Sequence, residues 1–144
     1  MKYFIVLCLV SVTLAEEKSA CQLHRERELA KEAIPGRLVP ECEEDGSYKA
    51  MQCHSGGSRF CQCWGEDGTI LTAPSTRLTA CKCIREKATA EERGKHMVGV
   101  FVPDCEPDGT YLKKQCWPST GHCWCADKDG NKVTEPTRSG VQCE

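Results

Sequence analysis

Cysteine dominates the side chains of this chain that could do chemistry, because its sulfur forms disulfides, binds metal ions or acts as a nucleophile. The chain holds 13 cysteines in 144 residues. Twelve of them form two sets of six: Cys21, Cys42, Cys53, Cys61, Cys63 and Cys81, then Cys83, Cys105, Cys116, Cys123, Cys125 and Cys143. The gaps are 20, 10, 7, 1 and 17 residues in the first set, and 21, 10, 6, 1 and 17 in the second. The chain is therefore one unit written twice.

The thirteenth cysteine, Cys8, lies in an amino-terminal segment with the features of a secretory signal peptide. Lys2 gives a positive start, residues 3–12 are apolar, and Ala15 closes a small-residue cleavage site. The apolar run is too short to span a bilayer. We expect residues 1–15 to be removed and the mature chain to be secreted into the extracellular space, where an even number of cysteines forms disulfides. A buried amino-terminal strand is the alternative.

The charge balance excludes one class of partner. The formal net charge is −2, and it becomes −3 when Lys2 is lost, because residues 1–15 carry no other charge. Such a mildly acidic chain is no candidate for non-specific binding to nucleic acid. No later segment is apolar enough for a transmembrane helix. We expect a monomer without a cofactor or metal ion.

Each unit opens with a stretch of good helix formers. In the first unit Ser19 and Gln22 have capping-box spacing, and a helix is predicted over residues 23–33. In the second unit a helix is predicted over residues 84–95, with Gly94 as a breaker near its end. Both stretches are highly charged, which is typical of a solvated helix face.

Short strands and tight turns follow each helix. Asp67-Gly68 and Asp129-Gly130 come after the Cys-x-Cys pairs and are typical of hairpin turns. The units are too small for a hydrophobic core alone to stabilise them well, so disulfides at roughly 2–4 kcal/mol each are expected to supply most of the stability. We predict a small disulfide-rich α+β fold, with a short helix, a small antiparallel sheet and pinned loops in each unit. Only Lys82 separates the two cysteine sets, so we expect two abutting lobes with restricted relative motion.

The order of motifs is similar to that of the thyroglobulin type-1 family. Cys-x10-Cys contains Asp-Gly-x-Tyr-x3-Gln-Cys, and a short loop, Cys-x-Cys and a final cysteine follow, over residues 21–143. The second unit carries the Cys-Trp-Cys core around Trp124. The first unit has Gln62 where Trp is usual, and we expect Trp64 to supply the missing ring. The resemblance implies two tandem domains, at 19–82 and 83–144.

Six cysteines in one unit allow many connectivities, and spacing alone does not choose among them. The resemblance implies sequential pairing: Cys21–Cys42, Cys53–Cys61, Cys63–Cys81, Cys83–Cys105, Cys116–Cys123 and Cys125–Cys143. A zinc site at Cys-x-Cys with His54 or His122 is the alternative, and the absence of Cys-x2-Cys spacing disfavours it.

Members of this family called thyropins inhibit papain-like cysteine proteases by wedging loops into the active-site cleft. The resemblance implies that this chain inhibits a protease of the cathepsin L type through three loops per unit. Loop one lies between the first two cysteines, loop two between the third and fourth, and loop three before the sixth. The predicted protease contacts are Ala33, Ile34, Pro35, Gly36, Ser55, Gly56 and Gly57 in the first unit, and Met97, Val98, Gly99, Pro118, Ser119, Thr120 and Gly121 in the second.

The residues of these loops predict different stiffness in the two units. Pro35 restricts its own backbone and that of Ile34, so Ile34 is expected on a stiff support. The alternative is an ordinary turn after the helix with Ile34 packed inward. The second unit has no proline in loop one, so that loop should be softer. Loop two reverses the comparison, because Gly56-Gly57 loosens it in the first unit.

Three other functions compete with protease inhibition. An enzyme is disfavoured because every mature cysteine has a potential partner, the four histidines are scattered and no Gly-x-Ser-x-Gly motif is present. A non-inhibitory secreted module that binds other proteins is one alternative, since thyroglobulin type-1 domains also occur in such proteins. A venom component is another, because small secreted disulfide-rich repeats are common in venoms.

Overall fold

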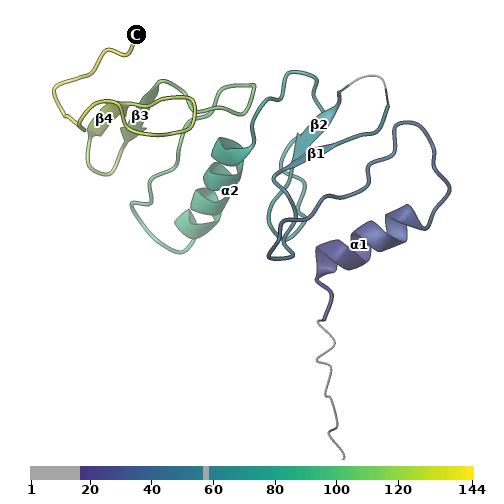
Figure 1. Ribbon diagram of the computed structural model, residues 1–144. Coiled ribbons are helices and arrows are strands. Elements are labelled where there is room, and N and C mark those ends of the chain that lie inside the picture. The colour runs from purple at the N-terminus through teal and green to yellow at the C-terminus, as the bar shows by residue number, and fades with distance from the viewer. Residues whose placement is uncertain (1–16, 57–58) are drawn as a thin grey trace, which may run out of the picture.

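The computed structural model describes residues 17–56 and 59–144. The predicted signal peptide with Cys8, and Gly57 of the predicted contacts, lie outside these residues. The elements in chain order are α1 (Ala20–Leu29), β1 (Met51–Cys53), β2 (Cys61–Cys63), α2 (Lys82–Gly94), β3 (Lys114–Trp117) and β4 (His122–Cys125). Strand β1 pairs with β2 and β3 with β4, both antiparallel, and α2 lies between the two small sheets (Figure 1). The predicted α+β class is confirmed. Neither helix in the described part of the chain has the length and apolar character that crossing a membrane requires.

Helix α1 begins as predicted and ends earlier. The capping box between Ser19 and Gln22 is present. The helix stops at Leu29 instead of residue 33. The guanidinium of Arg37 donates to the backbone oxygen of Glu28, an acceptor that a longer helix would use for its own hydrogen bonds. A contact made from nine residues further along therefore caps the helix end, and no local propensity reveals it.

The two hairpin turns after the Cys-x-Cys pairs are confirmed. Gly68 and Gly130 have φ angles of 89° and 88°, in the left-handed region that glycine adopts without strain. Single bridges close the turns, between Trp64 and Ile70 in the first repeat and between Ala126 and Lys132 in the second. Each of these turns therefore adds one bridge beyond the two named strands of its sheet.

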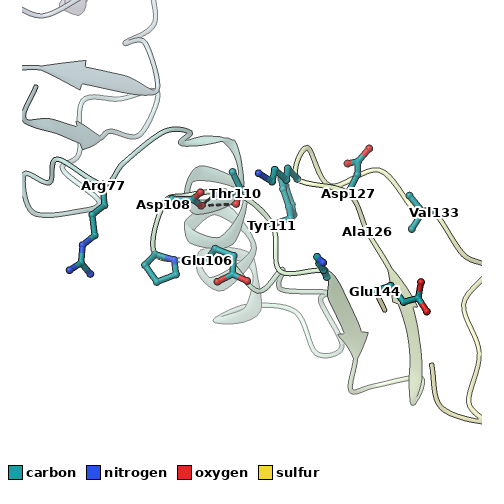
Figure 2. Close-up of a pocket in the computed structure, with 12 residues that line it drawn as sticks. Arg77, Glu106, Asp108, Thr110, Tyr111, Ala126, Asp127, Val133 and Glu144 are labelled. Carbon is teal, nitrogen blue, oxygen red and sulfur yellow. Dashed lines mark hydrogen bonds between the residues drawn. The ribbon is translucent and has the colours of Figure 1, made fainter. Parts of the chain in front are cut away.

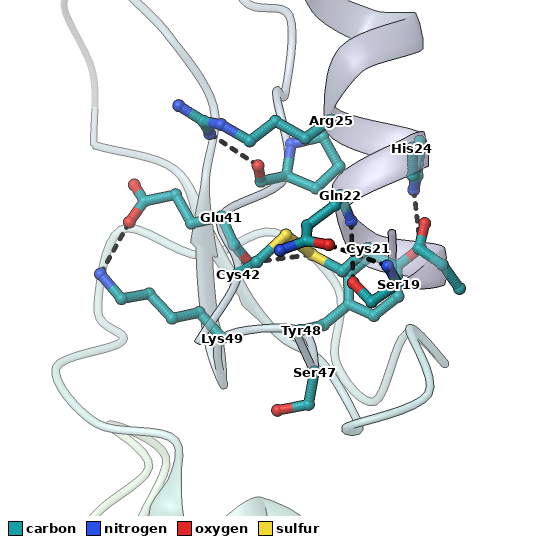
Figure 3. The surroundings of a disulfide bond; sticks show 12 residues. Ser19, Cys21, Gln22, His24, Arg25, Glu41, Cys42, Ser47, Tyr48 and Lys49 are labelled. Atoms are coloured by element: carbon teal, nitrogen blue, oxygen red, sulfur yellow. Dashed lines mark hydrogen bonds and ion pairs between the residues drawn. A yellow bond between two sulfur atoms is a disulfide. The ribbon is translucent and has the colours of Figure 1, made fainter. Parts of the chain in front are cut away.

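Six disulfides run through the centre of the two repeats. They join Cys21 to Cys42, Cys53 to Cys61, Cys63 to Cys81, Cys83 to Cys105, Cys116 to Cys123, and Cys125 to Cys143. Each bond closes its own loop, and several of the sulfur-bearing residues are fully buried. Around the first bond, Arg25 donates to the backbone oxygen of Pro40 at 2.7 Å, which ties the end of loop one to α1 (Figure 3).

A buried glutamine fixes the end of loop one in each repeat. Gln52 is fully buried, and its side-chain oxygen accepts from the backbone nitrogen of Glu41 at 2.9 Å. Its side-chain nitrogen donates to the backbone oxygens of Glu41 and Lys49 at 2.8 and 3.0 Å. Gln115 makes the same three bonds, to Asp104 and Leu112. Both ends of loop one are therefore held, by a disulfide and by an amide side chain.

The aromatic residues of the two cores occupy different positions. In the first repeat the ring centroid of Trp64 lies 5.6 Å from that of Tyr48, and Leu38 packs against the same cluster. In the second repeat Trp124 lies 5.0 Å from Phe101, which stands at the position of Leu38. Positions two residues apart in a strand share one face of the sheet, so Trp64 supplies its ring from the expected neighbouring position.

The two repeats contact each other through α2 and the turns beside it. The guanidinium of Arg85 donates from Nε to the backbone oxygen of Trp64 at 2.9 Å, and from Nη2 to that of Tyr48 at 2.7 Å. The backbone nitrogen of Thr79 donates to the backbone oxygen of Asp108 at 2.8 Å. These contacts and the short connection join the two lobes directly, and their restricted relative motion stays a prediction.

Candidate functional site

Loop one of the first repeat presents an apolar side chain on a tight turn. The backbone nitrogen of Arg37 donates to the backbone oxygen of Ile34 at 3.4 Å, and Pro35 and Gly36 are the two central residues. Gly36 has a φ of 81°, which a type II turn requires at its third position. The side chain of Ile34 is 59% exposed. Ile34 therefore points outward, and the inward-packed alternative is wrong.

Loop two of the first repeat supports this turn directly. The backbone nitrogen of Gly36 donates to the backbone oxygen of Ser55 at 2.7 Å. The backbone nitrogen and the hydroxyl of Ser55 both donate to the backbone oxygen of Arg37, at 2.9 and 2.8 Å. The Nδ1 atom of His54 lies 3.0 Å from the backbone oxygen of Gly36, and because a carbonyl only accepts, His54 is the donor. Four hydrogen bonds thus join loops one and two.

Loop three lies on the other side of loop two. The backbone groups of Cys61 and Ser75 exchange two hydrogen bonds, at 3.1 and 2.9 Å. A shallow groove of about 490 Å³ separates the loops, with Pro35, Phe60 and Pro74 among its lining residues. We call the three adjoining loops of one repeat its loop edge. In the first repeat this edge is an apolar ridge beside a groove.

The second repeat builds its loop edge with different contacts. Met97 and Val98 are 62% and 106% exposed at the tip of loop one. The indole nitrogen of Trp117 donates to the backbone oxygen of Gly99 at 2.9 Å. Trp117 follows Cys116 as His54 follows Cys53, so a ring N–H at equivalent positions holds an equivalent glycine. The bond that the backbone nitrogen of Ser55 donates has no counterpart, because Pro118 stands at that position and has no N–H.

Loop two of the second repeat is instead held from within and from loop three. The backbone nitrogens of Thr120 and Gly121 both donate to the backbone oxygen of Trp117, at 3.1 and 2.9 Å. The Nε atom of Arg138 in loop three donates to the backbone oxygen of Thr120 at 3.0 Å. This loop is therefore tied to loop three more closely than its counterpart in the first repeat.

The structure brings the predicted contact residues of each repeat together at its loop edge. Of the thirteen that lie in the described residues, eleven are exposed, whereas Gly99 and Thr120 are half-buried. Sequence reasoning missed Phe60, which is 43% exposed beside the groove, and the ring donors at His54 and Trp117. A large apolar residue beside a disulfide in a polar loop was the available signal for Phe60. No sequence signal indicated the two ring hydrogen bonds.

Away from the loop edges, several acidic groups have shifted pKa values. A hydrogen bond from the hydroxyl of Ser47 lowers the pKa of Asp45, and one from Thr110 lowers that of Asp108. Burial, followed by the hydrogen bond to Glu86, raises the pKa of Tyr111. Within residues 17–56 and 59–144, no three His, Cys, Asp or Glu side chains gather as a metal site. The exposed groups at the loop edges are instead mainly backbone and apolar side chains.

A family model described as the thyroglobulin type-1 repeat matches residues 16–83 and again residues 81–143. The chain belongs to the thyroglobulin type-1 family. U20-hexatoxin-Hi1a of Hadronyche infensa is 46% identical over 142 residues, which cover 96% of each chain. U24-ctenitoxin-Pn1a of Phoneutria nigriventer is 34% identical over 119 residues, or 83% of this chain and 90% of the toxin. Equistatin of Actinia equina is 37% identical over 109 residues, or 69% of this chain and 46% of equistatin.

Proposed function

We propose that this protein is a secreted inhibitor of papain-like cysteine proteases of the cathepsin L type. The first repeat inserts its loop edge into the active-site cleft, with Ile34 as the leading apolar contact. Similarity to equistatin, a thyropin, supports the protease class. The observation that carries the proposal is the exposed Ile34 on a turn that four hydrogen bonds connect to loop two.

The loop edge is suited to block a protease without being consumed by it. Loops that are already ordered lose little conformational entropy when they bind. The disulfide between Cys53 and Cys61 and the one between Cys21 and Cys42 hold both ends of each loop. Cut ends therefore stay in place and resist the backbone movement that cleavage requires. An interface of ordinary size would bury roughly 1,600 Å² and draw most of its affinity from a few central contacts.

The proposal is tested by titrating papain and cathepsin L with the purified protein, with its disulfides intact. We expect inhibition at or below micromolar protein, and the absence of inhibition at that concentration would contradict the proposal. Ile34→Asp and Ile70→Asp form a matched pair, because each isoleucine is 59% exposed and only Ile34 lies at the loop edge. Ile34→Asp should raise the inhibition constant at least tenfold, since burying an isoleucine contributes about 1.5–3 kcal/mol. Ile70→Asp should leave it unchanged.

The second repeat extends the proposal to a second protease contact. Met97 and Val98 are exposed apolar residues on an equivalent loop, and they would contact the same enzyme or another protease. Separate titrations with Ile34→Asp and Val98→Asp variants distinguish these cases. Residual inhibition that only Val98→Asp removes would assign it to the second repeat.

A toxin component that binds a target other than a protease is the second candidate. The similarity to two proteins named as toxins, across most of the chain, favours it. Inhibition assays separate the candidates, since a toxin that is not an inhibitor would leave papain and cathepsin L fully active. Secretion is tested independently, by sequencing the amino terminus of the exported protein for cleavage after Ala15.

A further inference from the structure

One arginine fills a defined position on the first repeat. Arg85 of α2 reaches two backbone oxygens, those of Tyr48 and Trp64, with two nitrogens of one guanidinium group. Ala50 and Glu66 of the first repeat also lie beside α2, around a common surface cleft. The first repeat thus has a face on which a neighbouring helix docks through arginine.

The second repeat has the same face. Tyr111 and Ala126 stand at the positions of Tyr48 and Trp64. Their backbones are arranged alike, because the nitrogen of Tyr48 donates to the oxygen of Glu66 at 3.1 Å and that of Tyr111 to the oxygen of Lys128 at 3.2 Å. The hydrogen bonds found among the described residues include none to the backbone oxygens of Tyr111 and Ala126, whereas Arg85 occupies both acceptors in the first repeat.

An open cleft of about 690 Å³ lies over these two residues (Figure 2). Tyr111, Ala126 and Val133 provide its apolar lining, and the acidic side chains of Glu106 and Glu144 lie around it. Val133 stands at the position of Leu71, which lines a cleft beside α2 in the first repeat. The cleft in the second repeat therefore corresponds to the face that α2 covers in the first.

We propose that this cleft binds an arginine side chain presented by a helix of a partner polypeptide. A guanidinium group carries several N–H donors in a planar fork, which matches two neighbouring carbonyl oxygens. Asp108 and Asp127 add further negative charge to the lining. The lining also contains three cationic residues, Arg77 of the first repeat, Lys113 and Lys128, against the four acidic ones. Lys113 and Lys128 stand at the positions of Ala50 and Glu66, so the partner helix would carry acidic residues beside its arginine.

A second copy of this chain does not fit the same role. The helix of the first repeat that corresponds to α2 is α1, and Leu23 stands there at the position of Arg85. Leucine has no side-chain donor for the two carbonyl oxygens. Copies of the chain therefore lack the group needed to dock head to tail, and the partner is a different polypeptide. The proposal does not depend on protease inhibition, because none of the predicted contact residues lines this cleft.

The test is an NMR titration of the full-length, ¹⁵N-labelled protein with two peptides. One peptide copies residues 82–94 with Cys83→Ser, and the other also carries Arg85→Leu. We expect the first peptide to shift the amides of Leu112 and Asp127, which follow the two acceptor carbonyls, and the second to bind at least tenfold more weakly. Equal binding of the two peptides, no binding, or shifts confined to other residues would overturn the proposal.

Charge reversal on the protein gives an independent arm of the test. Glu106→Lys should weaken binding of the arginine peptide several-fold, and Glu91→Lys, a control on the exposed surface of α2, should not. The HSQC spectrum of each variant shows whether its fold is kept. Equal weakening by both variants would indicate non-specific attraction, and a dimer of the chain that Glu106→Lys dissociates would overturn the assignment to another polypeptide.

Discussion

The two repeats share one frame of disulfides and buried glutamines and differ where the loops meet. In the first repeat Ser55 and His54 join loop one to loop two with four hydrogen bonds. In the second repeat Pro118 replaces Ser55, and one bond from Trp117 remains. There Arg138 ties loop two to loop three instead. The shared disulfides and buried glutamines therefore determine where the loops lie. Single residues determine which loop is held by hydrogen bonds from its neighbours.

This comparison predicts that different loops make the strongest contacts at the two loop edges. In the first repeat, hydrogen bonds from a neighbouring loop hold loop one, and Ile34 lies at its tip. In the second repeat, hydrogen bonds hold loop two more than loop one, and the tip of loop one carries the exposed Met97 and Val98. Because supported loops bind with a smaller loss of entropy, the strongest contacts should come from loop one in the first repeat and loop two in the second.

The largest effect is expected from adding a methyl group at one pair of equivalent glycines. A Cβ at Gly109 would lie 1.7 Å from the backbone oxygen of Ala80, at the contact between repeats, whereas a Cβ at Gly46 would meet the side chain of Ser19 at 2.7 Å. Both positions have positive φ angles, which costs about 1 kcal/mol in either variant. Gly109→Ala should cost more than about 3 kcal/mol in the free energy of unfolding, and Gly46→Ala less. Denaturant unfolding measures both, and equal losses would show that the repeats do not pack as described.

The next largest effect is expected from replacing the buried glutamine that each repeat contains. Gln52→Leu and Gln115→Leu each remove three hydrogen bonds from a buried site. Each should lower the free energy of unfolding by about 2–4 kcal/mol, because backbone groups lose their partners. Thermal unfolding of the two variants checks this. A large loss of stability in only one of the two variants would show that the two glutamines do not have equivalent roles.

A smaller effect is expected when Ser55 of the first repeat is replaced by proline, the residue at the equivalent position of the second repeat. Ser55→Pro gives the first repeat the residue of the second and removes both bonds that Ser55 donates to Arg37. We expect inhibition by the first repeat to weaken about tenfold, since each lost hydrogen bond contributes about 0.5–1.5 kcal/mol. Ser75→Ala, in loop three, serves as a control that keeps the backbone bonds to Cys61. Unchanged inhibition by Ser55→Pro would show that the link between loops one and two is unimportant.

The smallest effect is that of acid on Asp45 and Asp108, each of which precedes a glycine, Gly46 or Gly109. Hydrogen bonds lower the pKa of Asp45 and Asp108, so these groups stabilise the fold above the unfolded value of about 4. That contribution is lost as the pH falls through the folded value. Melting temperatures between pH 6 and 2 should therefore decline below about pH 4. The decline should be shallower in Asp45→Asn and Asp108→Asn, and an unchanged slope would contradict the assignment.

The sequence predicted most of the fold because cysteine spacing and Asp-Gly turns are local signals. The duplication, the capping box at Ser19 and both hairpins follow from residues close together in the chain. The early end of α1 does not, because Arg37 caps it through a contact from outside the helix. The contact of Arg85 with the first repeat was hidden in the same way, since a charged helix residue looks like a solvated one.

At the loop edges the sequence indicated positions but not contacts. Pro35-Gly36 predicted the turn, and the structure shows it with Ile34 exposed. The roles of His54 and Trp117 depend on how loops one and two cross, which no short-range pattern contains. Phe60 lies beside a disulfide in a polar loop, and its exposure next to the groove depends on how the three loops meet.

Hydrogen exchange of the protein bound to cathepsin L shows directly whether the loop edge of the first repeat occupies the active-site cleft. We expect new protection in residues 33–37, 54–56 and 59–60 of the first repeat, while α1 and the turns at Asp45-Gly46 and Asp67-Gly68 exchange as in the free protein. Protection confined to α1 or to those turns, or cleavage of the chain within residues 33–37, would contradict the proposal that the loop edge occupies the active-site cleft.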